Sequence, residues 1–124
     1  MYELTDIEIK DIEERFNIKI IDARKNPDIH KEVGMDLESF INKSYSSNEN
    51  IWLGFYEDDE LRVVSLFHEL GHNLIRESMS KYEQEKNAWD IGLKLALEYG
   101  ITFSLKTFEW VKKQLETYDK LEYK

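Results

Sequence analysis

The chain has 124 residues, and its 17 lysines and arginines against 26 aspartates and glutamates give a formal net charge of -9. That length suits one domain, which we expect to span residues 1–124. The lack of cysteine excludes disulfides, thiolate metal ligands and a thiol nucleophile, so any metal must be bound by histidine and carboxylate. The negative charge would repel a phosphate backbone, which argues against direct binding to nucleic acid.

Hydrophobic residues make up 41% of the chain, which is enough to form a folded core. No run of residues approaches the roughly 20 apolar positions of a membrane-spanning helix, and the N-terminus lacks the basic and apolar regions of a signal peptide. We therefore expect a cytoplasmic protein that does not associate with membranes. The sequence does not indicate an oligomeric state.

The first quarter of the chain predicts a helix followed by a strand. Thr5 and Glu8 form a capping box, and apolar residues at helical spacing continue the helix over residues 6–16. Alternating branched residues predict a strand over 18–22, and the turn residues at 26–28 interrupt the chain after it.

Two further elements are predicted before the midpoint. Apolar residues at helical intervals predict a helix over 29–43, in which Gly34 weakens the first turn. The polar segment 44–50 is typical of a loop. Aromatic and branched residues then predict a second strand over 51–56.

The second half of the chain predicts helices over residues 60–76, 81–99 and 104–120. Asp58 or Asp59 can cap the first of these helices. Ser80 and Glu83 form a capping box at the start of the second, and Gly100 can close it in the left-handed conformation. The last helix carries apolar residues on one side: Leu105, Phe108, Val111, Leu115 and Tyr118.

These elements together predict a small α+β fold that is mostly helical. We expect a short sheet of two to three strands packed beside the helix over 60–76. That helix also contains the most informative motif of the chain.

The motif is His68-Glu69-Leu70-Gly71-His72, which has the H-E-x-x-H pattern. His68 and His72 lie about 40° apart on one helix face, so both imidazoles can reach one ion. Glu69 lies about 60° from His72 and points beside the metal. The pattern predicts a zinc site in which Glu69 is the general base that activates water.

The alternative interpretation is that the two histidines are unrelated core or surface residues and that Glu69 is a solvated charge. The chain has only three histidines, so the pattern rarely arises by chance. The helix is also apolar almost all round, and two buried imidazoles without partners would be costly. The metal site is therefore the favoured interpretation.

A third metal ligand must be acidic, because no histidine follows His72. The downstream candidates are Glu77, Glu83, Glu85 and Asp90. Glu83 and Asp90 lie on the far side of their helix from Glu85, and Glu83 already has a capping role.

Glu85 is the predicted third ligand because it shares a helix face with the small residues Ala88, Gly92 and Ala96. Another helix can approach closely along such a stripe. The alternative is that Glu85 is an exposed charge paired with Lys81 or Lys86, with the small residues in ordinary packing.

These residues resemble the ImmA/IrrE-like zinc metallopeptidases of bacteria, phages and mobile elements. The resemblance covers about residues 51–97 and consists of the strand, the segment Val63 to His72, and Glu85-Lys86-Asn87-Ala88-Trp89. In that family, two histidines and a glutamate on the following helix bind zinc, and the glutamate after the first histidine is the general base. His68, His72, Glu85 and Glu69 match those positions.

The resemblance implies a minimal metallopeptidase domain that hydrolyses a peptide bond in a protein substrate, such as a DNA-binding repressor or another regulator of a mobile element. The acidic surface would suit a basic partner. It would equally suit the alternative function, a non-cleaving zinc-containing antirepressor or protein-binding module. A third alternative is an inactive scaffold that keeps zinc as structure, for which Glu69 would be unnecessary.

We expect an extended substrate segment to add to the strand over 51–56 by pairing with its free backbone groups. Candidates for stabilising the oxyanion are Tyr82, Tyr56 and His30. Trp89 is expected in the core or in a groove wall, with the core as the preferred interpretation.

Overall fold

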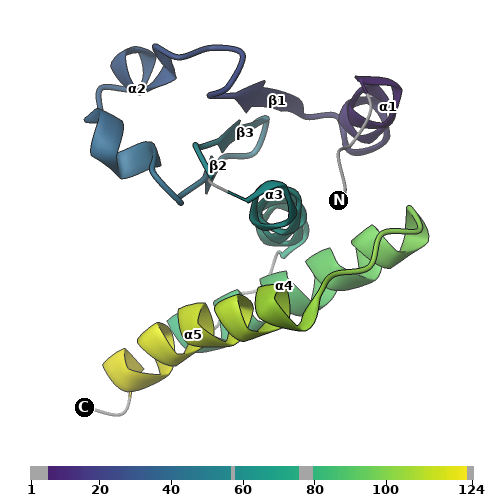
Figure 1. Cartoon of the computed structure of the whole chain (residues 1–124), viewed down its shortest axis with the longest axis vertical. Coiled ribbons are helices and arrows are strands. Elements are labelled where there is room, and N and C mark those ends of the chain that lie inside the picture. The colour runs from purple at the N-terminus through teal and green to yellow at the C-terminus, as the bar shows by residue number, and fades with distance from the viewer. Residues whose placement is uncertain (1–5, 57, 76–79, 123–124) are drawn as a thin grey trace. The chain divides into compact units, whose positions relative to one another are not determined.

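The computed structural model describes residues 6–56, 58–75 and 80–122 (Figure 1). Its elements are α1 (Asp6–Phe16), β1 (Lys19–Asp22), α2 (Ile29–Glu32), the 3-10 helix η1 (Leu37–Phe40), β2 (Tyr45–Ser46), β3 (Asn50–Leu53), α3 (Asp59–Leu74), α4 (Lys81–Glu98) and α5 (Leu105–Glu122). Helices predominate over one small mixed sheet, which confirms the predicted α+β class. None of the helices in the described ranges has both the length and the apolar character needed to cross a bilayer.

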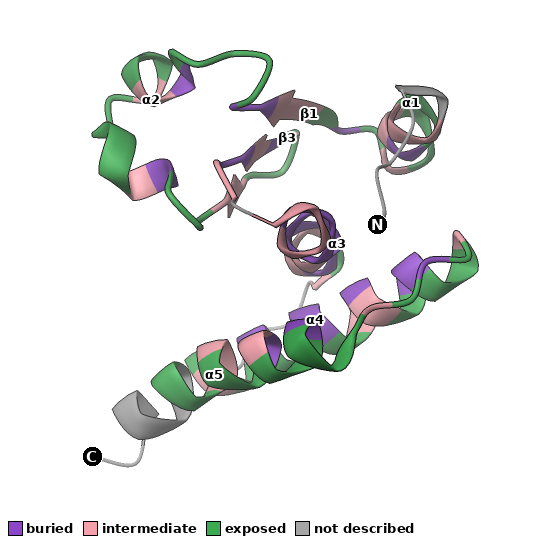
Figure 2. Cartoon of the chain, viewed as in Figure 1, coloured by how far each residue is buried: buried purple, intermediate pink, exposed green. Residues whose placement is uncertain are grey.

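The chain divides into two compact units, Met1–Leu66 and Phe67–Lys124, with the boundary inside α3. The sheet belongs to the first unit, and the second contains the end of α3 with α4 and α5. Figure 2 shows α3 as largely buried, and every residue from Arg62 to Phe67 is buried. The two units are groups of residues that mainly contact one another, and either one domain or two could contain them. The single domain expected over residues 1–124 therefore stays a prediction.

In the first unit, β3 is the central strand of the sheet, which has the order β1-β3-β2. β1 pairs with β3 in parallel and places Ile20 opposite Ile51. β2 pairs with β3 antiparallel and places Tyr45 opposite Trp52. Both sides of β3 are therefore hydrogen-bonded within the chain.

A strand does lie at the start of the predicted range 51–56, but it is the central strand of the sheet and not an edge strand. Its regular part ends at Leu53, and beyond it the amide of Gly54 donates to Ser44 Oγ at 3.1 Å. The proposed addition of a substrate segment along this strand is wrong, because β1 and β2 already occupy its two edges. The predicted loop 44–50 contains β2, whose two residues are too few to show an alternating pattern.

The helix predicted over 29–43 is also wrong. α2 ends at Glu32, because Gly34 takes a left-handed φ of 72° that a continuing right-handed helix cannot contain. The path then turns into η1, and Ile29 and Phe40 meet with Ala23 in a buried cluster. A straight helix would have held Ile29 and Phe40 about 16 Å apart, so burial of both favours the broken path.

The outer edge of β1 is covered by a side chain from α1. Glu13 Oε2 accepts a hydrogen bond from the amide of Ile20 at 2.9 Å, and its backbone carbonyl accepts one from the amide of Ile18 at 3.1 Å. The amides of Lys19 and Ala23 point the other way, towards the β3 side of the sheet. The side chain of Glu13 therefore satisfies an outward-facing amide of the edge strand.

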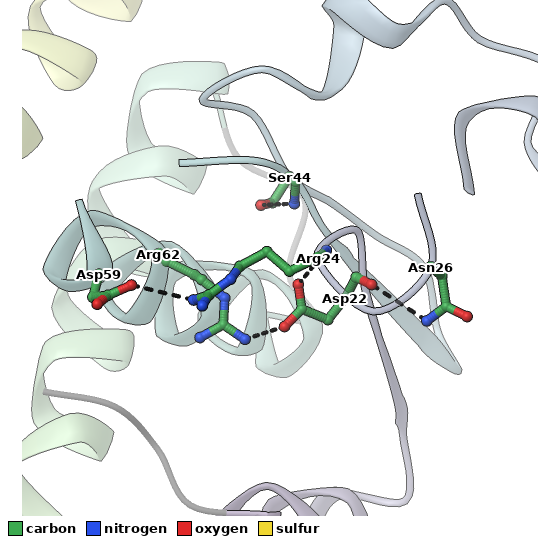
Figure 3. A network of polar contacts seen from close by, with 7 residues as sticks. Asp22, Arg24, Asn26, Ser44, Asp59 and Arg62 are labelled. Carbon is green, nitrogen blue, oxygen red and sulfur yellow. Dashed lines mark hydrogen bonds and ion pairs between the residues drawn. The ribbon is translucent and has the colours of Figure 1, made fainter. Parts of the chain in front are cut away.

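A buried ion pair joins the end of β1 to the first turns of α3 (Figure 3). The carboxylate of Asp22 accepts hydrogen bonds from the guanidinium of Arg62 and from the amide of Arg24, the latter at 2.9 Å. Asp22 and Arg62 are both buried. Arg24 makes a second, more exposed ion pair with Asp59 at 3.2 Å. These contacts link segments that are about 40 residues apart in the sequence.

We expect Asp22→Ala to lower the free energy of unfolding by about 3 to 5 kcal/mol, because Arg62 would stay buried without its counter-charge. Asp59→Ala is the matched control, since it removes one partner of the more exposed pair and should cost less than about 1 kcal/mol. Urea denaturation of both variants measures the difference. Equal losses in the two variants would contradict the dominant role of the buried pair.

The second unit is built from helices whose ends the sequence predicts well. The amide of Glu83 donates to Ser80 Oγ at 3.2 Å, which confirms the predicted cap of α4. Gly100 has a left-handed φ of 73° and closes α4, while the amide of Ile101 donates back to the carbonyl of Ala96. The Thr5 cap predicted for α1 and residue 76 of the predicted third helix lie outside the described residues.

α5 lies alongside α4, but its buried face differs from the predicted one (Figure 1). Val111 is buried as predicted, together with Thr107 one turn earlier. Leu105 and Phe108 are exposed, and Leu105 has 74% of its surface accessible. The predicted apolar stripe is therefore only partly correct. The buried face of α5 contains Thr107 and Val111. Hydropathy alone does not mark a threonine as a buried residue. The side chain of Tyr118 lies outside the described residues.

Candidate metal centre

His68 and His72 lie one turn apart near the end of α3, as the motif predicts. Their ring centroids are 4.5 Å apart, and the ring planes meet at 64°. Neither side chain is fully exposed, with accessible fractions of 15% and 24%. The two imidazoles can therefore converge on one point beside the helix.

Glu85 on α4 lies at that point. Its Oε2 atom is 2.7 Å from Nε2 of His68 and 3.0 Å from Nε2 of His72. One nitrogen from each imidazole and one carboxylate oxygen lie within 4.8 Å of one another. Among the described residues, this is the group of histidine and acidic side chains whose donor atoms could hold a metal ion.

Two glycines explain how Glu85 reaches the histidines. A side chain built at Gly71 would overlap the carbonyl oxygen of Ala88 on α4, and one at Gly92 would overlap the carbonyl oxygen of Phe67 on α3. Ala88 and Ala96 are fully buried on the same face of α4 as Glu85. The predicted small-residue stripe is thus the surface along which the two helix backbones come close together.

The other acidic candidates are not part of this group. Glu83 and Asp90 are exposed, and Glu77 lies outside the described residues. Glu85 itself is only 6% exposed, so it is not the solvated helix charge of the alternative interpretation.

Glu69 is buried beside the first histidine, with 6% of its surface exposed. Its Oε1 atom is 3.8 Å from Nδ1 of His68, which is too long for a hydrogen bond. The two nitrogens of the His68 ring therefore have different neighbours: Nε2 contacts Glu85, and Nδ1 is near Glu69. Glu69 is therefore close to His68 but is not one of the three residues of the group.

The charges in this group shift the protonation equilibria of its members. Burial alone would raise the pKa of Glu85, but hydrogen bonds and positive charge from the two imidazoles outweigh it and lower that pKa to about 2. Burial lowers the pKa of His68 despite the contact with Glu85. Burial also acts to lower the pKa of His72, but the hydrogen bond and charge of Glu85 outweigh it and raise that pKa.

Sequence reasoning did not identify the contact that Trp89 makes in this site. Its indole stacks on the imidazole of His68, with ring centroids 3.8 Å apart and planes 6° apart. Trp89 is 3% exposed, so its expected core position is correct, but that expectation did not include a contact with His68. Its position four residues after Glu85 places both side chains on one face of α4, and this spacing was the available signal.

The residues considered for oxyanion stabilisation are dispersed along the chain. Tyr82 lies on α4, three residues before Glu85, and is partly buried. Tyr56 and His30 belong to the first unit, where the hydroxyl of Tyr56 lies 2.8 Å from Ser44 Oγ. These three assignments stay predictions.

The donor set fits a catalytic type of metal site. Two imidazole nitrogens and one carboxylate oxygen form a common ligand set of catalytic zinc, and they leave a coordination position for water or substrate. A structural zinc site is normally closed by four protein ligands. The group His68, His72 and Glu85 therefore has the chemistry that an open zinc site requires.

Comparisons of the chain with protein-family models, with curated proteins and with solved structures give no significant match. The resemblance to the metallopeptidases therefore depends on the motif residues and stays a prediction.

We expect Glu85→Gln to lower the pKa of His72, because the variant removes the negative charge that favours the imidazolium. Ring-proton NMR titration of chelator-treated protein measures this, with His72→Asn used for assignment. In the wild type, His72 should titrate above its usual pKa of 6.5 and His68 below it. Glu83→Gln, an exposed change on the same helix, should leave both titrations unchanged. An unshifted His72 in Glu85→Gln would refute the electrostatic coupling.

Proposed function

We propose that this chain is a zinc-dependent metallopeptidase that hydrolyses a peptide bond in a protein substrate. The observation that carries the proposal is the approach of two histidine Nε2 atoms to one carboxylate oxygen of Glu85, beside the buried carboxylate of Glu69. Zinc is the metal proposed because its catalytic sites often use this donor set.

His68, His72 and Glu85 would hold the ion, and Glu85 would contribute a charged ligand. A bound zinc ion would supply Lewis-acid polarisation of the scissile carbonyl. The contact of Glu85 Oε2 with Nε2 of both imidazoles supports its role as a ligand, because one carboxylate oxygen lies beside both nitrogen donors.

Glu69 would be the general base and then the general acid. Its carboxylate accepts a proton from the attacking water as the new C–O bond forms, and it returns that proton to the leaving amine as the C–N bond breaks. Glu69 regains its charge at the end of the cycle, so the reaction consumes one water and no other reagent. Its position supports this role, since it is buried beside His68 without belonging to the group of possible metal ligands.

The proposed substrate is a DNA-binding repressor or another regulator, as the resemblance to the ImmA/IrrE-like metallopeptidases implies. The net charge of -9 favours encounter with a basic protein of this kind. A cytoplasmic location is part of the same proposal. The charge also suits a non-cleaving antirepressor, so cleavage itself must be measured.

The metal assignment predicts about one equivalent of zinc in the wild-type protein, lost in His68→Ala and in Glu85→Ala. Each change removes one of three ligands, and three-ligand sites bind weakly after such a loss. Elemental analysis after dialysis against a weak chelator measures the zinc content. His30→Ala and Glu83→Ala are matched controls that should keep the metal, because neither residue belongs to the group. Full zinc content in Glu85→Ala would exclude it as a ligand.

The proposed cleavage reaction predicts that Glu69→Gln behaves differently from the His68→Ala and Glu85→Ala variants. This variant should keep its zinc and lose activity by about 10²- to 10⁴-fold, because the amide cannot accept the proton. The measurement is mass spectrometry of fragments after the zinc-loaded protein is incubated with regulators encoded beside its gene. Undiminished cleavage by Glu69→Gln would remove Glu69 from the mechanism. Stable binding without fragments in the wild type would support the antirepressor alternative.

A further inference from the structure

Three aromatic rings from three helices form a continuous contact in the second unit. The imidazole of His68 on α3 stacks flat on the indole of Trp89 on α4, at 3.8 Å between centroids and 6° between planes. Trp89 meets the ring of Trp110 on α5 edge to face, at 6.0 Å and 87°. The indole of Trp89 is therefore contacted by His68 and by Trp110.

A flat stack restricts how His68 can turn. Rotation of the imidazole out of its plane would drive ring atoms into the indole, because interiors are close-packed. Only the observed orientation and its 180° flip keep the stack. The observed orientation directs Nε2 to Glu85 at 2.7 Å, whereas a flip would direct Nε2 towards the side occupied by Glu69.

We propose that Trp89 is a positioning residue whose indole fixes the plane of His68, so that Nε2 is presented to the metal ion. This inference deepens the proposed function and depends on it. Outer contacts of this kind orient metal ligands, and they commonly involve hydrogen bonds to the second ring nitrogen. Here the orientation comes from the face of the ring.

The stack also has an electrostatic preference. An imidazole that coordinates a cation carries more positive charge than a free neutral one, and the face of an indole is electron-rich. Trp89 therefore stabilises the coordinated form of His68 more than the free form. The expected order of zinc affinity at position 89 is tryptophan, then phenylalanine, then leucine.

The state of the indole nitrogen allows the zinc affinities of tryptophan and phenylalanine at position 89 to be compared directly. Nε1 of Trp89 is buried and makes no hydrogen bond to the described part of the chain. Trp89→Phe therefore keeps an aromatic face against His68 and removes a donor that has no partner there. Trp89→Leu keeps an apolar side chain but removes the face.

The test is zinc affinity, measured by competition with a chromophoric chelator. Trp89→Leu should bind zinc about 10- to 100-fold more weakly than the wild type, and Trp89→Phe within about threefold of it. Trp52→Phe, a substitution in the first unit, should have no effect. Wild-type affinity in a folded Trp89→Leu variant would overturn the positioning role, as would an equal loss in Trp89→Phe and Trp89→Leu.

A fluorescence measurement tests the contact when Trp89→Leu does not fold. The double variant Trp52→Phe, Trp110→Phe leaves Trp89 as the single tryptophan, because the chain has three. Zinc should change its emission, because the imidazole stacked on this indole becomes more positive when it coordinates the ion. Unchanged emission at zinc saturation would overturn the inference alone. Failure of the wild type to bind zinc would overturn both the inference and the proposed function.

Discussion

The close approach of the α3 and α4 backbones is the constraint on which the candidate metal centre depends. A glutamate side chain is short, so Glu85 Oε2 can contact both histidines only if the two helix backbones lie close together. Gly71 and Gly92 allow this, because a carbonyl oxygen of the opposite helix occupies the space that a side chain at either position would need. Gly71 occupies one of the unspecified positions of the H-E-x-x-H motif. In this chain that position is therefore part of the site, because it determines the distance between the helices that supply the ligands.

The parts of the site that depend on helix periodicity were predictable. The spacing of His68 and His72 places both on one face of a helix without reference to the rest of the fold. Glu85 could be selected over Glu83 because it shares a face with residues small enough for helix contact. The orientation of the rings was not predictable in this way, since the stack on Trp89 depends on the rotamers of two side chains from different helices.

The failures in the first unit have a common origin in contacts between distant segments. The segment from Ile29 to Phe40 has helical spacing, but the left-handed Gly34 and the burial of both ends in one cluster override it. The strand after residue 50 has the composition of any half-buried strand, and composition does not reveal whether its two edges are taken. The buried pair of Asp22 and Arg62 is equally hidden in the sequence, where 40 positions separate the partners.

The carboxylate of Glu13 at the outer edge of β1 has a consequence for the behaviour of the protein at high concentration. An uncovered edge strand can template pairing with a strand of another molecule, which is a common start of aggregation. Because Glu13 already accepts the outward-facing amide of Ile20, an incoming strand would have to displace a charged side chain to form that bond. The Glu13 side chain thus opposes edge-to-edge growth of the sheet at this position of β1.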